Sequence, residues 1–190
     1  MGYFDVYQFR IATDKAVYHI RFLKFYKLNN KMTYRNNGAV GALLDEYERA
    51  IKDLKKVLRT ITPKELLTIV DTTTADEYCR SIQTILAHVV RSGYGYAVYV
   101  RKFHGENLDF RDIQWLNSAK EYSKALDKMF DYNVQLFKDY PNLTLEEFDN
   151  DKKVPVRWGQ RYDVEQLFEH AIVHILRHRR QIERFLLILR

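Results

Sequence analysis

Apolar residues recur every three or four positions in four long stretches of the chain, which is the spacing of an amphipathic helix. A shorter helix is expected where Thr62-Pro63-Lys64-Glu65 forms a capping box with proline at the first helical position. The predicted helices span about 40–60, 63–70, 75–104, 110–140 and 163–190. Four long amphipathic helices predict an all-α protein, built as an up-and-down four-helix bundle.

Capping residues and prolines indicate where the long helices begin and end. Thr74-Ala75-Asp76-Glu77 has the form of a capping box, so we expect the second long helix to begin there. Asp109 can cap the third helix, and Asp163 the fourth. Pro141 ends the third helix, and the connection 141–162 is expected to cross one end of the bundle.

The first 31 residues do not fit this pattern. They are rich in aromatic residues and keep neither the helical nor the strand period for long. Met32 then begins a stretch that reads like the start of a domain. We therefore divide the chain into an N-terminal extension, 1–31, and a bundle domain, 32–190. Our hypothesis is that Met32 is the natural start, and the alternative is a short arm that packs on the bundle.

The positive charge of the chain is uneven, which limits what it says about partners. Of the formal net charge of +6, residues 1–31 contribute six basic and two acidic side chains, or +4, so we expect no nucleic-acid partner. The single cysteine, Cys79, excludes an internal disulfide and fits a reducing compartment. No apolar run of about 18 residues is present, so we expect no membrane span and a cytoplasmic protein.

The last helix carries polar residues inside its apolar face. His170, His174 and His178 follow one another at steps of four residues, about one helical turn. His174, His178 and Gln181 lie on the apolar stripe, where leucines would be expected. Polar groups in a core need partners, and an i, i+4 histidine pair can give two imidazoles to one metal ion. The pair can be metal ligands or ordinary hydrogen-bonded core residues, and the spacing does not decide between the two.

A further histidine, His88, lies on the inward stripe of the second long helix. The small residues Ser92 and Gly95 follow on that stripe and would leave space for a cavity. We predict a histidine triad of metal ligands, His88, His174 and His178. Three imidazoles leave one coordination position free, as in catalytic sites. His170 lies roughly 12 Å along the axis from His178 and cannot easily join the same ion.

The other residues near this site have weaker assignments. Gln181 is one turn beyond His178 and is expected to form a hydrogen bond with a ligand histidine. Cys79 is more than two turns before His88 in the predicted helix, which is too far to share its ion. A single histidine such as His88 is more often a hydrogen-bonded core residue than a ligand. No catalytic base and no residue for another cofactor can be named.

Two motifs resemble the DinB/YfiT-like superfamily of metal-binding four-helix bundles. The first is H-x-x-x-H-R-x-Q, from His174 to Gln181, and the second surrounds His88 in Ile85-Leu86-Ala87-His88-Val89. The helix order over about 32–190 is similar too. The resemblance maps the three histidine ligands of the family onto His88, His174 and His178. The extra His170 and Arg180, which is more often glycine in the family, depart from the pattern, and 1–31 has no counterpart.

The resemblance implies a function as well as a fold. It implies a divalent metal, with zinc or nickel typical, and frequently a homodimer. Some relatives are S-transferases that attach a low-molecular-weight thiol to an electrophile, and others are assigned only as hydrolases or damage-inducible proteins. A small-molecule substrate follows, with a metal that lowers the pKa of the thiol or activates water. The alternative is a non-enzymatic stress-related protein whose metal is structural or absent, and a structural site would be closed by a fourth protein ligand.

Overall fold

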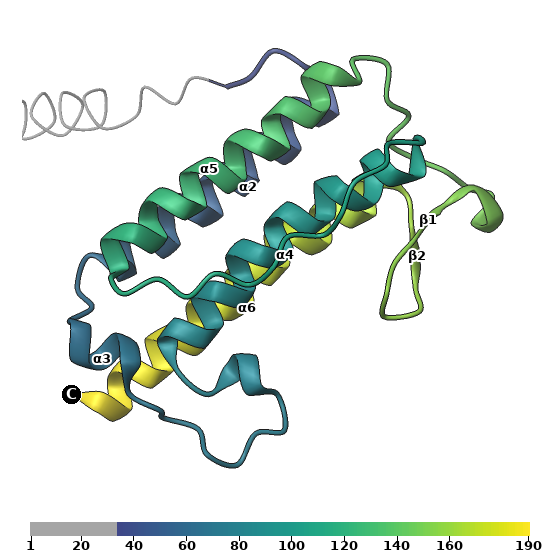
Figure 1. The fold of residues 1–190 in the computed structure, drawn as a ribbon. Coiled ribbons are helices and arrows are strands. Elements are labelled where there is room, and N and C mark those ends of the chain that lie inside the picture. Colours follow the sequence, from purple (N-terminus) through teal and green to yellow (C-terminus); the bar gives the residue numbers. More distant parts are fainter. Residues whose placement is uncertain (1–33) are drawn as a thin grey trace, which may run out of the picture. The chain divides into compact units, whose positions relative to one another are not determined.

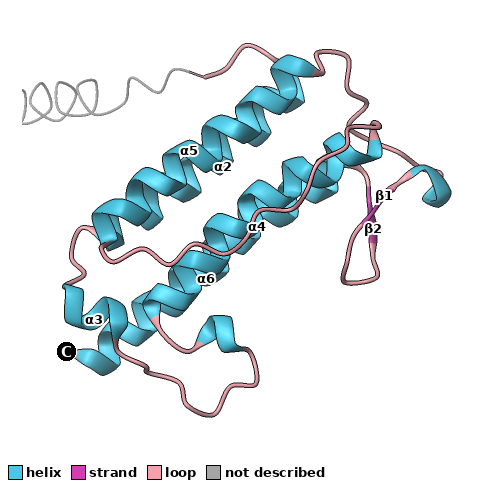
Figure 2. Cartoon of the chain, in the orientation of Figure 1, coloured by secondary structure: helices cyan, strands magenta, loops and turns pink. Residues whose placement is uncertain are grey.

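The computed structural model describes residues 34–190, in which four long helices form a bundle (Figures 1 and 2). The long helices are α2 (Gly38–Leu58), α4 (Ile82–Phe103), α5 (Ala119–Asp139) and α6 (Val164–Leu189). The short elements are α3 (Pro63–Leu67), the 3-10 helices η1 (Glu77–Cys79) and η2 (Asn150–Lys152), and the antiparallel strands β1 (Val154–Pro155) and β2 (Arg161–Tyr162). The predicted all-α four-helix bundle is confirmed. The extension 1–31 and the hypothesis on Met32 lie outside the described residues.

Two of the predicted helix starts are found where the sequence places them. In α3, Thr62 Oγ1 accepts from the Glu65 amide at 3.2 Å, and Glu65 Oε2 accepts from the Thr62 amide at 2.7 Å. In α6, Asp163 Oδ1 accepts from the Gln166 amide at 2.8 Å. These reciprocal bonds satisfy amides that have no partner within the first helical turn.

The predicted start of the second long helix at Ala75 is wrong. Helix α4 begins at Ile82, and its capping box is formed by Ser81 and Thr84, with the Thr84 amide donating to Ser81 Oγ at 3.1 Å. Ser81 pairs with Ile69 in an antiparallel bridge, which holds the backbone before α4 extended. The segment 68–81 is therefore a loop, within which Asp76 caps only η1.

The predicted start of the third helix near Phe110 is also wrong, because α5 begins at Ala119 and is capped by Ser118. Residues 105–118 instead run back along α4 without regular structure, as Figure 1 shows. Three hydrogen bonds from α4 hold this returning segment: Lys102 Nζ to Leu108 O at 2.7 Å, Arg91 Nε to Arg111 O at 3.2 Å, and Gln83 Nε2 to Leu116 O at 2.9 Å.

The returning segment sets the direction of the helices. Because it carries the chain back along α4, α5 starts beside the start of α4 and runs the same way. Helices α2 and α6 both run in the opposite direction. Helix α2 packs on α6 and α5, and helix α6 packs on α2 and α4. The consecutive helices α4 and α5 are thus parallel, which departs from strict up-and-down alternation. Helices α4 and α6 are antiparallel neighbours.

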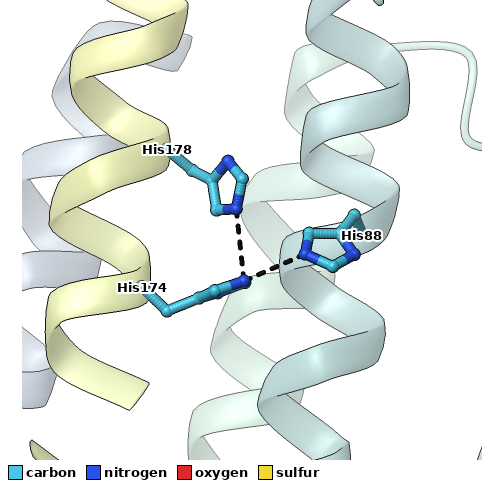
Figure 3. Close-up of side chains that lie close together, drawn as sticks. All are labelled: His88, His174 and His178. Atoms are coloured by element: carbon cyan, nitrogen blue, oxygen red, sulfur yellow. Dashed lines mark hydrogen bonds between the residues drawn. The ribbon is translucent and has the colours of Figure 1, made fainter. Parts of the chain in front are cut away.

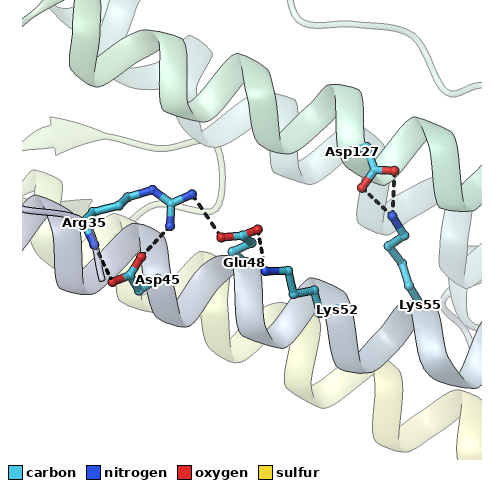
Figure 4. Close-up of polar contacts among 6 residues, drawn as sticks. All are labelled: Arg35, Asp45, Glu48, Lys52, Lys55 and Asp127. Atoms are coloured by element: carbon cyan, nitrogen blue, oxygen red, sulfur yellow. Dashed lines mark hydrogen bonds and ion pairs between the residues drawn. The ribbon is translucent and has the colours of Figure 1, made fainter. Parts of the chain in front are cut away.

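The core is continuous along the bundle and joins all four long helices. Tyr47 of α2 is fully buried, with its ring edge-on to Phe130 of α5 and Phe168 of α6. On the outside, Lys55 of α2 pairs with Asp127 of α5 at 2.5 Å (Figure 4). Exposed pairs of this kind contribute little, at most about 1 kcal/mol, so the apolar core holds the bundle together.

Two glycines of α4 have different environments. Gly93 faces α5, where a Cβ would collide with the side chain of Met129, so any larger residue would force the methionine to move. Gly95 faces the returning segment, and a Cβ there would contact only the Phe110 ring at 3.9 Å. The space that the small residues of this stripe were expected to leave is therefore filled by Phe110 on this side. Within residues 34–190, no helix is long and apolar enough to cross a bilayer.

Candidate metal centre

Helices α4 and α6 bring three imidazoles together in the middle of the bundle (Figure 3). His88 Nε2 lies 2.9 Å from His174 Nε2, and His178 Nε2 lies 3.2 Å from the same atom. His174 and His178 are buried, and His88 is half-buried. The three residues that the sequence predicts as ligands therefore lie within reach of one ion. Their ligation of a metal stays a prediction.

Two neighbours fix the orientation of the outer rings. His178 Nδ1 lies 3.1 Å from Gln181 Oε1, which is the contact expected from the sequence. Because an amide oxygen only accepts, we assign the proton of His178 to Nδ1, and its Nε2 then carries a lone pair. The Tyr78 ring stacks on the His88 ring at 5.5 Å between centroids, with 18° between their planes.

The three Nε2 atoms cannot all be satisfied by hydrogen bonds to one another. With Nε2 of His178 a bare acceptor, a proton on His174 Nε2 can serve this contact or the contact with His88, but it cannot serve both well. His174 Nδ1 is also buried and has no hydrogen-bond partner among the described residues. At least one of the two contacts therefore lacks a well-placed proton, which is unfavourable without a cation between the nitrogens, since buried polar groups need partners.

Burial keeps these rings neutral. It is the largest cause that lowers the pKa of His178, to about 4, followed by the charge that His88 would carry. Burial also lowers the pKa of His174 to about 2, helped by the charges of His178 and His88, and it lowers the pKa of His88. Neutral imidazole is the form that binds metals, so the three rings are ready as ligands at neutral pH.

The distances fit a metal ion. Nitrogens bound at 2.0–2.1 Å to a tetrahedral ion lie about 3.3 Å apart. The two Nε2 contacts, 2.9 and 3.2 Å, need to open by only a few tenths of an ångström to reach this separation. Within residues 34–190, no further histidine, cysteine or carboxylate joins the group, so three protein ligands leave one position open.

His170 lies outside the group, one turn before His174. Its ring stacks on Trp158 at 5.5 Å and meets the edges of Tyr162 and Tyr96 at 5.6 and 5.8 Å. Its centroid is 6.3 Å from that of His174. Burial lowers the pKa of His170, with a smaller effect of Arg177. His170 therefore belongs to an aromatic cluster beside the centre.

Cys79 lies closer to the centre than the sequence indicates. It is part of η1, and its Sγ lies 3.7 Å from Gln181 Oε1 and 3.3 Å from Asp76 Oδ2. A straight helix from Ala75 would have placed it more than two turns from His88, but the loop before α4 folds back toward α6. Burial raises the pKa of the Cys79 thiol. The periodicity of the sequence carries no signal for this contact, because it depends on the fold of a loop.

Comparison with known families agrees with this geometry. A model of the DinB superfamily matches residues 46–182, which is more than half of the chain and includes His88, His174 and His178. The chain belongs to the DinB superfamily. No curated protein is significantly similar to it. For this DinB-superfamily protein, the family and the three converging histidines together are compatible with a divalent-metal site.

Proposed function

We propose that this DinB-superfamily protein is a divalent-metal-dependent enzyme that transfers a low-molecular-weight thiol to electrophilic small molecules. The observation that carries the proposal is a set of three neutral imidazoles without a fourth protein ligand among the described residues. A structural site would be closed by such a ligand, whereas a catalytic site keeps a position for substrate. Zinc or nickel is the proposed metal, because both accept neutral imidazole ligands.

The residues of the chain have separate roles in this proposal. His88, His174 and His178 hold the metal, and Gln181 keeps Nε2 of His178 free of its proton through the contact at 3.1 Å. Tyr78 covers one face of the His88 ring and limits its rotation. When bound, the divalent ion would supply a positive charge that lowers the pKa of a thiol substrate. No side chain of the described residues is assigned as a general base.

The first experiment is metal analysis of the full-length protein after purification. We expect about one zinc or nickel ion per chain in the wild type, and a strong loss in His88→Ala, His174→Ala and His178→Ala. His170→Ala is the matched control, since this ring lies on the same helix but outside the group. Wild-type protein that carries no more metal than His174→Ala would remove the proposal.

The second experiment separates transfer from its alternatives. Metal-loaded protein is incubated with a chromogenic electrophile and a panel of low-molecular-weight thiols, and conjugate formation is compared with His174→Ala. Conjugation that depends on both thiol and metal supports the transferase. Loss of the electrophile to water alone supports a related hydrolase. Bound metal with neither reaction supports a non-enzymatic protein with a structural ion.

The last part of the proposal is the assembly of the protein. A homodimer is implied by resemblance to the family and is part of the proposal. Sedimentation analysis of the full-length protein tests it directly, and a monomer at micromolar concentration would contradict it.

A further inference from the structure

A cleft of about 730 Å³ lies next to the metal centre, between α6 and the loop before α4. The loop contributes Thr72, Thr73 and Thr74, and α6 contributes Arg177, Arg180 and Arg184. A volume of this size lies within the usual range of small-molecule sites, about 300–1,000 Å³. Its lining is more basic than acidic, with three arginines and two aspartates.

The three arginines of the cleft differ from two other arginines, one in α6 and one just after its end. Arg179 pairs with Asp53 at 3.4 Å, and Arg190 pairs with Glu65 at 2.9 Å. Within residues 34–190, no ion pair is formed by the arginines of the cleft: Arg177, Arg180 and Arg184. They lie three and four residues apart, so they form one stripe along the helix. These arginines line the cleft without a carboxylate partner among the described residues.

The two aspartates of the cleft are engaged by their own loop. Asp71 Oδ1 accepts from the amides of Thr73 and Thr74 at 2.9 and 3.0 Å. Asp76 Oδ1 accepts from the Tyr78 amide at 3.0 Å. These bonds shape the loop and direct the carboxylates toward backbone donors. The formal charge of the lining is +3 − 2 = +1, which favours an anion.

The cleft and the metal centre share a boundary. Gln181 lines the cleft and also contacts Nδ1 of His178. Arg177 is adjacent in sequence to His178, and its charge contributes to the lowered pKa of both His174 and His178. Arg184 is seven residues beyond Arg177, about 10 Å along the helix axis. The stripe therefore begins beside the histidines and leads away from them.

We propose that this cleft binds the anionic end of the substrate, a small molecule with a carboxylate or phosphate remote from its reacting group. The inference rests on the proposed function, because the reacting group would lie at the histidines. Arg180 and Arg184 hold the anion at the outer end of the cleft, since guanidinium binds carboxylate and phosphate through paired hydrogen bonds. Binding energy from this remote group positions the reacting end of the molecule.

Calorimetric titration of the full-length, zinc-loaded protein tests the inference. The probes are succinate and inorganic phosphate, and the neutral succinamide is the control ligand. We expect at least one of the two anions to bind and succinamide not to bind. The double variant Arg180→Gln/Arg184→Gln should lose affinity for that anion by about tenfold or more. Arg190→Gln, just after the end of α6 and outside the cleft, should bind like the wild type.

The outcomes separate this inference from the proposed function. Binding of only one anion identifies its chemistry as carboxylate or phosphate. Equal affinity in the wild type and in the double variant overturns the inference, as does the absence of binding by both anions to metal-loaded protein. The titration is repeated with His174→Ala. Anion binding that survives in this variant, together with a wild type that carries no metal, would leave the cleft in place and remove only the proposed enzyme.

Discussion

Replacing Gln181 with leucine should weaken metal binding without removing a ligand. In the wild type, the amide oxygen lies 3.1 Å from His178 Nδ1 and holds the proton there. Without this acceptor, the ring can move its proton to Nε2 and donate to His174 Nε2, which is 3.2 Å away. Metal binding must then reverse the tautomer, so the cost appears in the affinity for the ion.

The size of this effect follows from the hydrogen bond that is lost. A neutral hydrogen bond contributes about 0.5–1.5 kcal/mol, and a buried donor without a partner costs about 1–3 kcal/mol. Loss of the hydrogen-bond partner of a metal-bound histidine usually weakens binding 10–100-fold, or by about 1.4–2.8 kcal/mol. We expect Gln181→Leu to fall in this range, and Gln181→Glu, which keeps an acceptor, to bind at least as tightly as the wild type.

Competition with a chromophoric zinc chelator at about pH 7.5, above the usual pKa of histidine, measures the affinities. Gln135→Leu is the matched control, because this glutamine is exposed on α5 and its side chain donates to Asp139 Oδ1 at 2.7 Å, away from the histidines. A dissociation constant for Gln181→Leu within about threefold of the wild type would refute the reasoning. So would an equal loss in the control variant.

Three further predictions concern stability and reactivity. Gly93→Ala should lower the stability by about 1–3 kcal/mol, because its Cβ meets a methionine of α5, whereas Gly95→Ala should not; equal melting temperatures would contradict this. The hydrogen bond from Arg190, with those of the α3 capping box, lowers the pKa of Glu65 to about 2. The stabilisation by Glu65 should thus be complete above the ordinary pKa and disappear as the pH falls toward 2, and an NMR titration with an ordinary midpoint would exclude it. Burial raises the pKa of Cys79, so iodoacetamide should alkylate it more slowly than a free thiol at neutral pH, and an equal rate would count against the described environment.

Periodicity predicts the elements whose stability comes from an apolar face. Leu44, Tyr47, Ile51 and Leu54 follow the helical spacing in the sequence, and all four are buried in α2. The same spacing fails for residues 110–118, where Ile113 and Leu116 pack on the core from a segment that is not helical. Long-range bonds from α4 decide the structure of this segment, and no local pattern encodes them.

The candidate site likewise contains residues that periodicity predicts and residues that it does not. Two of its histidines are predictable because an i, i+4 pair on one helix meets whatever the rest of the chain does. His88 requires that α4 and α6 be neighbours, for which the evidence in the sequence is its place on the inward stripe of its helix, together with the family resemblance. The contact of Cys79 with Gln181 and the basic cleft require the fold of the loop 68–81. The periodicity of the sequence therefore does not predict them.

The metal centre and the cleft differ in how firmly the core holds them, so substrate specificity can change without a change at the histidines. The three histidines lie in the middle of two long, packed helices, where backbone hydrogen bonds and the core fix their positions. The cleft is built from a loop and from exposed arginines of α6, which are not part of the core. Substitutions at Arg180 or Arg184 can therefore alter anion recognition while the histidine geometry is kept. Metal content that stays constant while anion affinity falls is the signature of this arrangement, whereas a joint loss would mean that cleft and centre form one structural unit.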